Sequence, residues 1–451
     1  MGNKIKAAFI GFGEINTPSD IIEKKLSTAR KDLEGLGIEL ITTKYVFDDL
    51  KRQEAERAVA DLKNKDFDFL VVCVAGWIPT YTIIRVISEF LHKPMLLWGL
   101  TGYYENGKMM TTADQAGTTA LRKPMEDMGY KFKYVYSTVD SPPPLDKIDT
   151  FARAAKTAHL LKHSRIGQMG YRDMKLYGTL FDGVSLRAKI GPEVEFFEML
   201  EIAQRIEGLD KSQIKRVVDK AKSEWKSDKA LKDEVLAMGA ELYLAVRQKV
   251  EEENYKAISL VDVDGVKKLM NYPPSSAFMM LADEMGLCTI PENDVPGNVT
   301  QLMTKYLTGQ IGAYFEFYEF MEDRVLIGVP DYVPSEVVDG PIKVMSTKFG
   351  LLEEGILNIS KVKTGSVTLC RLTSKGDKYF LHLLTGKAVE PRNWGEIGWE
   401  GGPQPPSLEV IPDVSMEDFA EKVAGQHYIL SYGDNTGLFK DLCRLLDIEI
   451  Y

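Results

Sequence analysis

Apolar and polar residues follow a regular rhythm along the first part of the chain, in which short apolar runs alternate with longer amphipathic stretches. The apolar runs predict four strands, at Lys6–Ile10, Ile38–Ile41, Phe69–Val74 and Pro94–Trp98. The charged stretches between them predict three helices, at Pro18–Leu36, Lys51–Lys63 and Thr80–Phe90. Because strands and helices alternate, the pattern indicates a parallel sheet covered by helices on both faces.

A second series of the same kind follows the proline-rich run Ser141–Pro144 and a further helix that ends near Leu161. Its predicted strands are Arg165–Gly170, Ala257–Val261 and Leu287–Ile290. Its predicted helices are Lys211–Trp225, Lys229–Glu253, Pro274–Met285 and Asp294–Leu307. This series predicts a second α/β domain that ends at Gly309.

Beyond Gly309, apolar runs recur without helical stretches between them. The predicted strands are Tyr314–Phe320, Val325–Val329, Ile342–Ser346, Ser366–Leu372 and Tyr379–Leu384. Such a pattern is typical of an antiparallel sheet or barrel. We therefore expect an α/β protein with three domains: an N-terminal α/β domain (1–163), a second α/β domain (164–309) and a β-rich C-terminal domain (310–451).

Composition narrows the class of protein and its partners. The chain has 451 residues and a formal net charge of −10, without a long cluster of lysine or arginine, so a nucleic-acid partner is not expected. No run approaches the ~18 apolar residues that a membrane span requires. All four cysteines lie in apolar contexts, and residues 1–10 lack the apolar stretch of a secretion signal. These features predict a cytoplasmic protein that handles small molecules.

The loop after the first predicted strand, Gly11-Phe12-Gly13, matches only the start of a dinucleotide-binding fingerprint. Asn16 stands where the third glycine of that fingerprint belongs. The pattern therefore gives nucleotide binding little support.

Three residues far apart in the chain are candidates for one metal site: Glu292, Glu316 and His427. Each lies beside or within an apolar run, and a carboxylate in such surroundings is costly to bury unless its charge is offset. Two carboxylates and an imidazole are suitable ligands for a divalent cation. From the residues alone, each has a structural alternative: a charge at a helix start, a charge on an edge strand and a structural histidine.

Several short motifs occur in an order and spacing that resemble the L-fucose/L-arabinose isomerase family, closer to the L-fucose isomerase branch. The motifs are Gly76–Pro79, Leu97–Gly99, Arg165–Gly167, Pro291–Pro296, Leu307–Gln310 with Glu316, and Gln426–Asp434. The likeness extends over nearly the whole chain.

This resemblance implies a metal-dependent sugar isomerase, which interconverts an aldose and a ketose through an enediol. The expected substrate is a pentose or a 6-deoxyhexose similar to L-fucose or D-arabinose. It also implies that Glu292, Glu316 and His427 hold a divalent metal, usually Mn²⁺, and that the two glutamates act as the catalytic acid–base pair. A homo-oligomer is expected, with a hexamer favoured, in which the loop around Trp77 completes the active site of a neighbouring subunit.

Further residues are expected to line the sugar pocket: Trp77, Tyr318, Asp331 and Trp394, with Arg392 and Trp399 as weaker candidates. The chain also departs from the family. The loop at Gly328–Asp331 lacks a histidine that many relatives carry, which disfavours arabinose isomerase activity, and Glu316 stands where fucose isomerases usually have aspartate.

These departures leave two alternatives open. One is a catalytically silent sugar-binding or regulatory protein that keeps the isomerase fold, and the other is an isomerase for a charged sugar.

Overall fold

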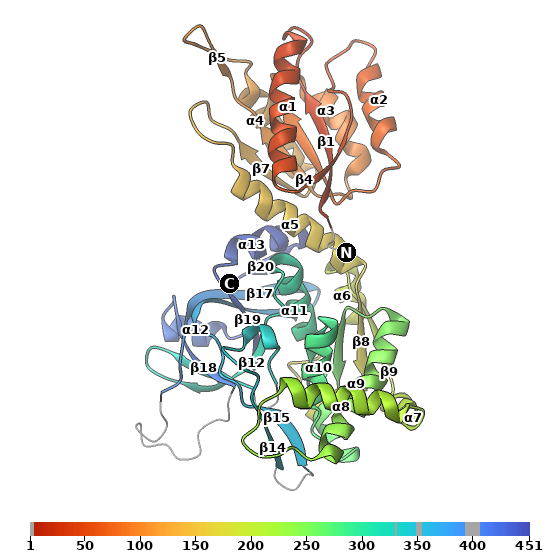
Figure 1. The fold of residues 1–451 in the computed structure, drawn as a ribbon. Coiled ribbons are helices and arrows are strands. Elements are labelled where there is room, and N and C mark those ends of the chain that lie inside the picture. The colour runs from red at the N-terminus through yellow and green to blue at the C-terminus, as the bar shows by residue number, and fades with distance from the viewer. Residues whose placement is uncertain (1–3, 330–331, 349–353, 393–405) are drawn as a thin grey trace. The chain divides into compact units, whose positions relative to one another are not determined.

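The structure is a computed structural model that describes residues 4–329, 332–348, 354–392 and 406–451. It divides into two compact units (Figure 1). The first unit comprises Met1–His159 and Gly437–Leu446, and the second comprises Leu160–Thr436 and Asp447–Tyr451. The expected boundary after residue 163 lies near the first of these divisions, whereas the expected boundary after residue 309 lies inside the second unit.

The first unit contains a sheet of five parallel strands in the order β2-β1-β3-β4-β7. The strands are β1 (Lys6–Phe12), β2 (Glu39–Thr42), β3 (Phe69–Val74), β4 (Met95–Gly99) and β7 (Phe132–Tyr136). Every residue of β3 and β4 is buried, as expected for central strands that helices cover on both faces. The predicted parallel α/β architecture is confirmed for this part of the chain.

Helices of the first unit follow the strands in the predicted alternation (Figure 1). They are α1 (Ser19–Gly35), α2 (Gln53–Leu62), α3 (Thr80–Ile87), α4 (Asp114–Asp127), most of α5 (Leu145–Lys162) and nearly all of α13 (Thr436–Leu446). A short hairpin, β5 (Tyr103–Glu105) with β6 (Lys108–Met110), precedes α4. The C-terminal helix α13 is tied into this unit because Asp441 accepts hydrogen bonds from Lys133 in β7 and, at 3.1 Å, from Thr150 in α5.

The two glycines at the end of β1, Gly11 within the strand and Gly13 just after it, are explained by packing of α1 against the sheet. A Cβ atom at Gly11 would lie 2.3 Å from Leu26 Cδ1, and one at Gly13 would lie 2.5 Å from Ile22 Cδ1. Since α1 begins only at Ser19, its first turn does not directly follow the strand as it does in a dinucleotide-binding loop. The two glycines therefore allow close helix–strand contact.

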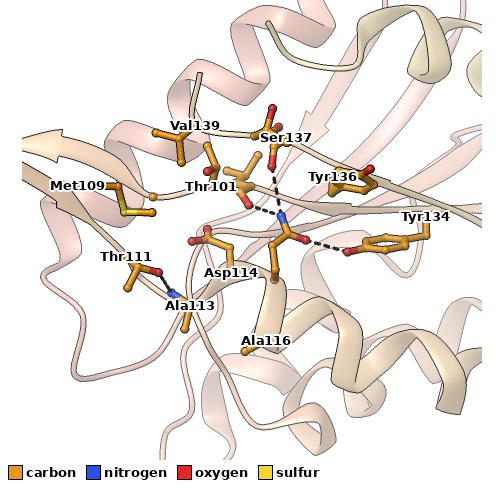
Figure 2. A pocket seen from close by; sticks show the side chains of 14 residues that line it. Thr101, Met109, Thr111, Ala113, Asp114, Ala116, Tyr134, Tyr136, Ser137 and Val139 are labelled. Atoms are coloured by element: carbon orange, nitrogen blue, oxygen red, sulfur yellow. Dashed lines mark hydrogen bonds between the residues drawn. The ribbon is translucent and has the colours of Figure 1, made fainter. Parts of the chain in front are cut away.

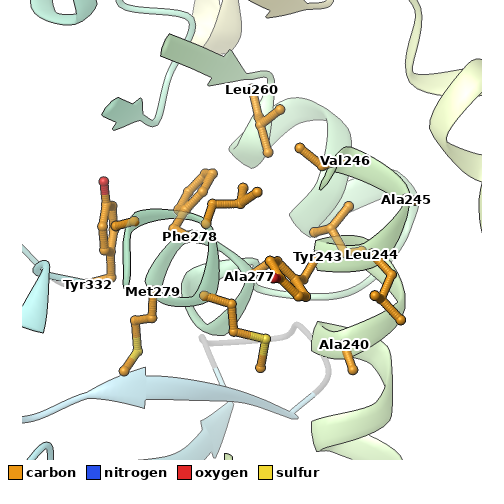
Figure 3. Close-up of a cluster of buried hydrophobic side chains, with 14 of the residues drawn as sticks. Ala240, Tyr243, Leu244, Ala245, Val246, Leu260, Ala277, Phe278, Met279 and Tyr332 are labelled. Carbon is orange, nitrogen blue, oxygen red and sulfur yellow. The ribbon is translucent and has the colours of Figure 1, made fainter. Parts of the chain in front are cut away.

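The second unit contains a sheet of four parallel strands in the order β11-β10-β8-β9. These strands are β8 (Arg165–Met169), β9 (Glu193–Phe197), β10 (Ala257–Leu260) and β11 (Cys288–Ile290). Its helices are α6 (Gly183–Lys189), α7 (Met199–Glu207), α8 (Lys211–Glu224), α9 (Asp233–Glu253), α10 (Ser275–Met285) and α11 (Val295–Thr308). Apolar side chains of α9 and α10 fill the core beside this sheet, together with Leu260 and Tyr332 (Figure 3).

An antiparallel sheet of seven strands in the order β16-β19-β12-β13-β18-β17-β20 forms the rest of the second unit's framework. Because β16 also pairs with β17, six of these strands close into a barrel. The strands are β12 (Ala313–Phe320), β13 (Val325–Gly328), β16 (Gly365–Lys375), β17 (Lys378–Val389), β18 (Ser407–Pro412), β19 (His427–Tyr432) and β20 (Ile448–Ile450). A hairpin of β14 (Val344–Lys348) and β15 (Glu354–Asn358) and the helix α12 (Met416–Lys422) complete this part. The predicted antiparallel C-terminal region is confirmed.

Helix α11 connects the two sheets of the second unit. It packs against β10 and β11 of the parallel sheet and against β16 and β19 of the barrel. Its buried polar side chains bond to the barrel: Thr300 accepts a hydrogen bond from the Leu372 amide at 3.0 Å, and Gln301 donates to the Gly312 carbonyl at 3.2 Å. The loop that precedes α11 is therefore fixed beside β12 and β19.

Among the described residues, no helix is both long and apolar enough to cross a membrane.

Candidate active site

The structure brings together the three residues that the sequence singled out. Glu316 on β12 and His427 on β19 are direct partners in the antiparallel ladder. Nε2 of His427 lies 3.6 Å from Glu316 Oε2, and Nδ1 lies 3.8 Å from Glu292 Oε2. The imidazole thus lies between two carboxylates, one from the barrel and one from the loop after β11.

An unusual backbone conformation places Glu292. Glu292 and Asn293 both adopt the left-handed region, with φ of 64° and 55°. Residues other than glycine persist there only when their surroundings hold them. The Glu292 amide donates to Asp262 Oδ1 at 2.7 Å, and the Asn293 side chain donates to the Met169 carbonyl at 2.8 Å. The carboxyl ends of β8, β10 and β11 therefore fix the direction of the Glu292 backbone.

The imidazole of His427 is held in a buried position. Only 5% of the residue is exposed, and its ring stacks on Tyr314 with the centroids 4.2 Å apart and the planes at 15°. Burial lowers the pKa of His427 to about 3, because the effects of Asp294, which raises it, and Arg371, which lowers it, are smaller. At neutral pH the ring is uncharged and carries one N–H, so one ring nitrogen directs a lone pair outward.

The free energy of unfolding is expected to decrease with falling pH in the metal-free protein. Burial lowers the pKa of His427 to about 3 and that of His382 to about 4, whereas each would titrate near 6.5 in the unfolded chain. Below pH 6.5 the unfolded state therefore takes up protons that the folded state excludes. Each histidine should contribute a loss of about 1.4 kcal/mol per pH unit until its folded-state pKa is reached.

Urea unfolding at pH 7, 6 and 5 measures this dependence. The variant His427→Asn should show a slope that is shallower by about 1.4 kcal/mol per pH unit, because one of the two titrating groups is gone. An unchanged slope would show that His427 is not buried in the uncharged form.

The side chains of Glu292, Glu316 and His427, here called the trio, suit a divalent cation. They offer carboxylate oxygens and an uncharged imidazole nitrogen, which are ligands for Mn²⁺ and similar ions. The present arrangement of the trio is not that of a formed site, since no group of three or more His, Cys, Asp or Glu side chains in the described ranges is arranged to hold a metal ion. Each glutamate faces a different ring nitrogen of His427. The residues fit a metal by their chemistry, and a side chain must rotate before all three meet it.

The second glutamate has defined neighbours along the rim of the barrel. Oε2 of Glu316 accepts a hydrogen bond from Gln426 at 2.8 Å. The ring of Tyr318 lies over Gly328, the ladder partner of Glu316, because a Cβ atom at Gly328 would be only 2.4 Å from Tyr318 Cε2. A bulge between Phe317 and Glu319 shifts the register at this point. Tyr318 therefore provides an aromatic wall beside Glu316.

The other predicted pocket residues have different positions. Trp77 lies in the first unit, in the loop after β3, and is 40% exposed. Arg392 bonds to Glu409, through its backbone amide at 2.9 Å and its Nε at 3.2 Å. Asp331, Trp394 and Trp399 lie outside the described residues, and their roles stay predictions.

A buried ion pair lies near His427 and was not predicted from the sequence. Arg371 on β16 donates two hydrogen bonds to the carboxylate of Asp294, and the bond from Nη2 to Oδ1 is 2.9 Å long. Asp294 also caps α11 by accepting from the Gly297 amide at 3.0 Å, and it accepts from the Tyr314 hydroxyl at 2.8 Å. A charged residue in the apolar run Leu369–Leu372 was the available signal, because arginine is rarely buried unless it is paired.

A separate cavity of about 690 Å³ lies in the first unit, at the carboxyl ends of β4 and β7 (Figure 2). Gln115 forms part of its wall, where it accepts from the Tyr134 hydroxyl at 2.7 Å and donates to the Leu100 carbonyl at 2.7 Å. The carboxylate of Asp114 is already bonded to Lys25 and Thr112. The surface of the cavity is mostly apolar, and the charge of Asp114 is offset by Lys25, so the cavity lacks the paired carboxylates of Glu292 and Glu316.

Comparisons with known proteins do not assign the chain to a family. No protein-family model and no curated protein matches it. One similar solved structure is a periplasmic solute-binding protein of an ABC transporter from Actinobacillus succinogenes with bound D-allose. The two chains are 11% identical, with 78% of this chain and 97% of that chain covered, and the TM-score is 0.18. Another is isoflavone reductase, with 12% identity, 53% and 87% coverage and a TM-score of 0.19. TM-scores this low do not establish a shared fold.

Proposed function

We propose that this protein is a metal-dependent aldose–ketose isomerase that acts on a pentose or a 6-deoxyhexose, with a fold like that of L-fucose isomerase. One observation carries the proposal. The family resemblance assigns Glu292, Glu316 and His427 to one metal, and each of the two glutamates has a carboxylate oxygen within 4 Å of a ring nitrogen of His427. The resemblance rests on sequence motifs alone, so the proximity of the three side chains in space supports the proposal independently.

The arrangement of the glutamates suits proton transfer between C1 and C2 of an open-chain sugar. Both side chains are partly accessible, with 14% of Glu292 and 21% of Glu316 exposed, so a substrate can reach them. One carboxylate removes the C2 proton and the other exchanges a proton with the sugar oxygens, which requires each to lie within hydrogen-bond reach. A bound Mn²⁺ would supply Lewis-acid stabilisation of the charge that develops on O1 and O2. Tyr318 offers an aromatic surface for the apolar face of the sugar.

We further propose a cytoplasmic homo-oligomer, with a hexamer favoured, in which the Trp77 loop completes a neighbour's site. Large apolar side chains are exposed on the segments that follow β3 and β4 of the first sheet, as on an interface. They are Trp77, Tyr81, Tyr104 and Met109, which are 40–56% exposed. Light scattering coupled to gel filtration should detect an assembly larger than the 50.7 kDa chain.

The activity is tested with metal-free protein reloaded with Mn²⁺ and assayed against a panel of aldopentoses and 6-deoxyhexoses. Ketose should form, and solvent deuterium should appear at C2 of the recovered aldose. If no aldose on the panel is converted at any Mn²⁺ concentration, the isomerase proposal is wrong.

A catalytically silent sugar-binding protein is the second candidate. It is favoured by the absence of a formed metal-holding group within the part of the chain that the structure describes. Calorimetry separates the two: sugar binding that is equally tight with and without Mn²⁺, together with no deuterium at C2, would support the silent protein.

A further inference from the structure

The contacts of His427 extend to a buried ion pair through two linked side chains. The imidazole stacks on Tyr314, whose hydroxyl donates to Asp294 Oδ2 at 2.8 Å. Asp294 in turn accepts two hydrogen bonds from the guanidinium of Arg371. All four residues are at least 95% buried. A continuous chain of contacts thus joins His427 to the Asp294–Arg371 ion pair.

Each link is attached to a different element of the second unit. Tyr314 lies on β12, Asp294 caps α11 and Arg371 lies on β16. A guanidinium that bonds both oxygens of a carboxylate fixes its plane. The Gly297 amide and the Gly178 carbonyl bind the same pair, at 3.0 Å and 3.2 Å. The carboxylate therefore has little freedom to rotate, and the position of the Tyr314 hydroxyl is fixed with it.

The hydroxyl of Tyr314 anchors its ring through the hydrogen bond to Asp294. A phenylalanine would occupy nearly the same volume without placing a polar group in the interior, and burial of a hydroxyl is costly unless it is bonded. The ring nitrogens of His427 lie 3.6 and 3.8 Å from the glutamate oxygens, beyond ordinary hydrogen-bond length. Stacking against the anchored Tyr314 ring, with the two planes at 15°, therefore constrains the plane of the imidazole.

We propose that Tyr314, anchored through Asp294 and Arg371, is a positioning residue that holds the His427 ring between Glu292 and Glu316. The positioning itself rests on the contacts among His427, Tyr314, Asp294 and Arg371. Its consequence for metal affinity rests on the proposed function.

The positioning is tested by NMR on metal-free protein labelled in its histidine rings. The chain has five histidines, so the spectrum is simple, and His427→Asn identifies the His427 signal. Ring current from Tyr314 should displace this signal upfield. Tyr314→Leu should abolish the displacement, and Tyr314→Phe, which keeps the ring but loses the anchor, should cause a smaller shift in the same direction and broaden the signal.

Tyr272→Phe is the matched control, since Tyr272 is another buried tyrosine of the second unit whose hydroxyl is bonded, here to Ser276 at 2.5 Å. Its substitution should leave the His427 signal in place. If both Tyr314 variants shift the signal no more than Tyr272→Phe does, the proposal is overturned. Tyr314→Phe decides the question even if Tyr314→Leu does not fold.

A Mn²⁺ titration distinguishes failure of the positioning role from failure of the proposed function. Residues that orient metal ligands typically change affinity by about 10- to 100-fold when they are replaced. We therefore expect the Kd for Mn²⁺ to rise by about tenfold or more in Tyr314→Leu. An unchanged Kd overturns the positioning role in metal binding. A wild-type protein that binds no Mn²⁺ overturns the metal-dependent function, while the ring signals still decide whether Tyr314 holds His427.

Discussion

Replacement of Glu316 by glutamine is expected to lower kcat for sugar isomerisation by about 10²–10⁴-fold, the range that a positioned acid or base contributes. Glutamine keeps the size of the side chain and can still accept the hydrogen bond from Gln426, which is 2.8 Å long in the wild type. It cannot take up or release a proton at the pH of the assay. The loss should therefore appear in turnover while the fold, measured by circular dichroism and urea unfolding, is unchanged.

Glu319→Gln is the control for this experiment. Glu319 lies on the same strand three positions further on and its side chain is exposed. The same loss of charge there should leave kcat within a factor of about two, because exposed charges interact weakly across water. If Glu316→Gln and Glu319→Gln retain similar activity, Glu316 is not the acid or base.

Much of the architecture could be predicted because buried strands have a simple sequence pattern. The central strands β3 and β4 are apolar without interruption, and helix α11 begins where Asp294 was expected to start it. The edge strands β7 and β9 were missed, because residues such as Lys133, Glu193 and Glu195 interrupt their apolar pattern. Edge strands tolerate such residues because their unpaired edge and part of each face are exposed to solvent.

Closure of the barrel could not be predicted either. It depends on which strands pair. The pairing of β16 with β17 is a tight hairpin, but the pairing of β16 with β19 joins segments that are far apart in the chain and leave no local signal. The same limit applies to the site. The ladder places Glu316 opposite His427, and a shift of one residue in register would send one of the two side chains to the other face.

The candidate residues could be selected from their sequence context. The interactions that hold them in place could not be predicted. The sequence indicated Glu292 from a carboxylate beside an apolar run, whereas its left-handed backbone and its bond to Asp262 are tertiary features. Tyr314 shares the alternation of β12 with Glu316, so a place on the same face was predictable. Its stacking on His427 was not, because it depends on how two strands and α11 meet.

Replacement of Arg371 by methionine is expected to lower the free energy of unfolding by about 3–5 kcal/mol, the usual effect of removing one partner of a buried ion pair. Methionine fills much of the space but leaves the carboxylate of Asp294 buried, with the Tyr314 hydroxyl and the Gly297 amide as its remaining hydrogen-bond donors among the described residues. Urea unfolding at pH 7 measures the loss.

Two further variants separate the contribution of charge to stability from that of packing. Lys361→Met breaks an exposed pair with Glu390 at 2.5 Å and should leave the free energy of unfolding nearly unchanged, because solvent screens exposed ion pairs. Asp294→Asn in the Arg371→Met background removes the uncompensated charge and should recover part of the loss, because a buried pair replaced on both sides is often nearly neutral. If the double variant is less stable than Arg371→Met, packing of the guanidinium rather than the charge accounts for the effect.

The pH dependence of the Arg371→Met loss gives an independent check on the charge. Burial alone raises the pKa of Asp294, but in the wild type the Arg371 guanidinium, with the Gly297 amide, holds it below its usual value near 3.8. The wild-type pair thus contributes stability above that value and loses it as the pH falls through the folded-state pKa. Without Arg371 the carboxyl pKa is expected to rise, so the folded variant takes up a proton more readily than its unfolded chain. The difference between wild type and variant should consequently be smaller at pH 5 than at pH 7, and a difference that grows on acidification would show that Asp294 is not the charge left unpaired.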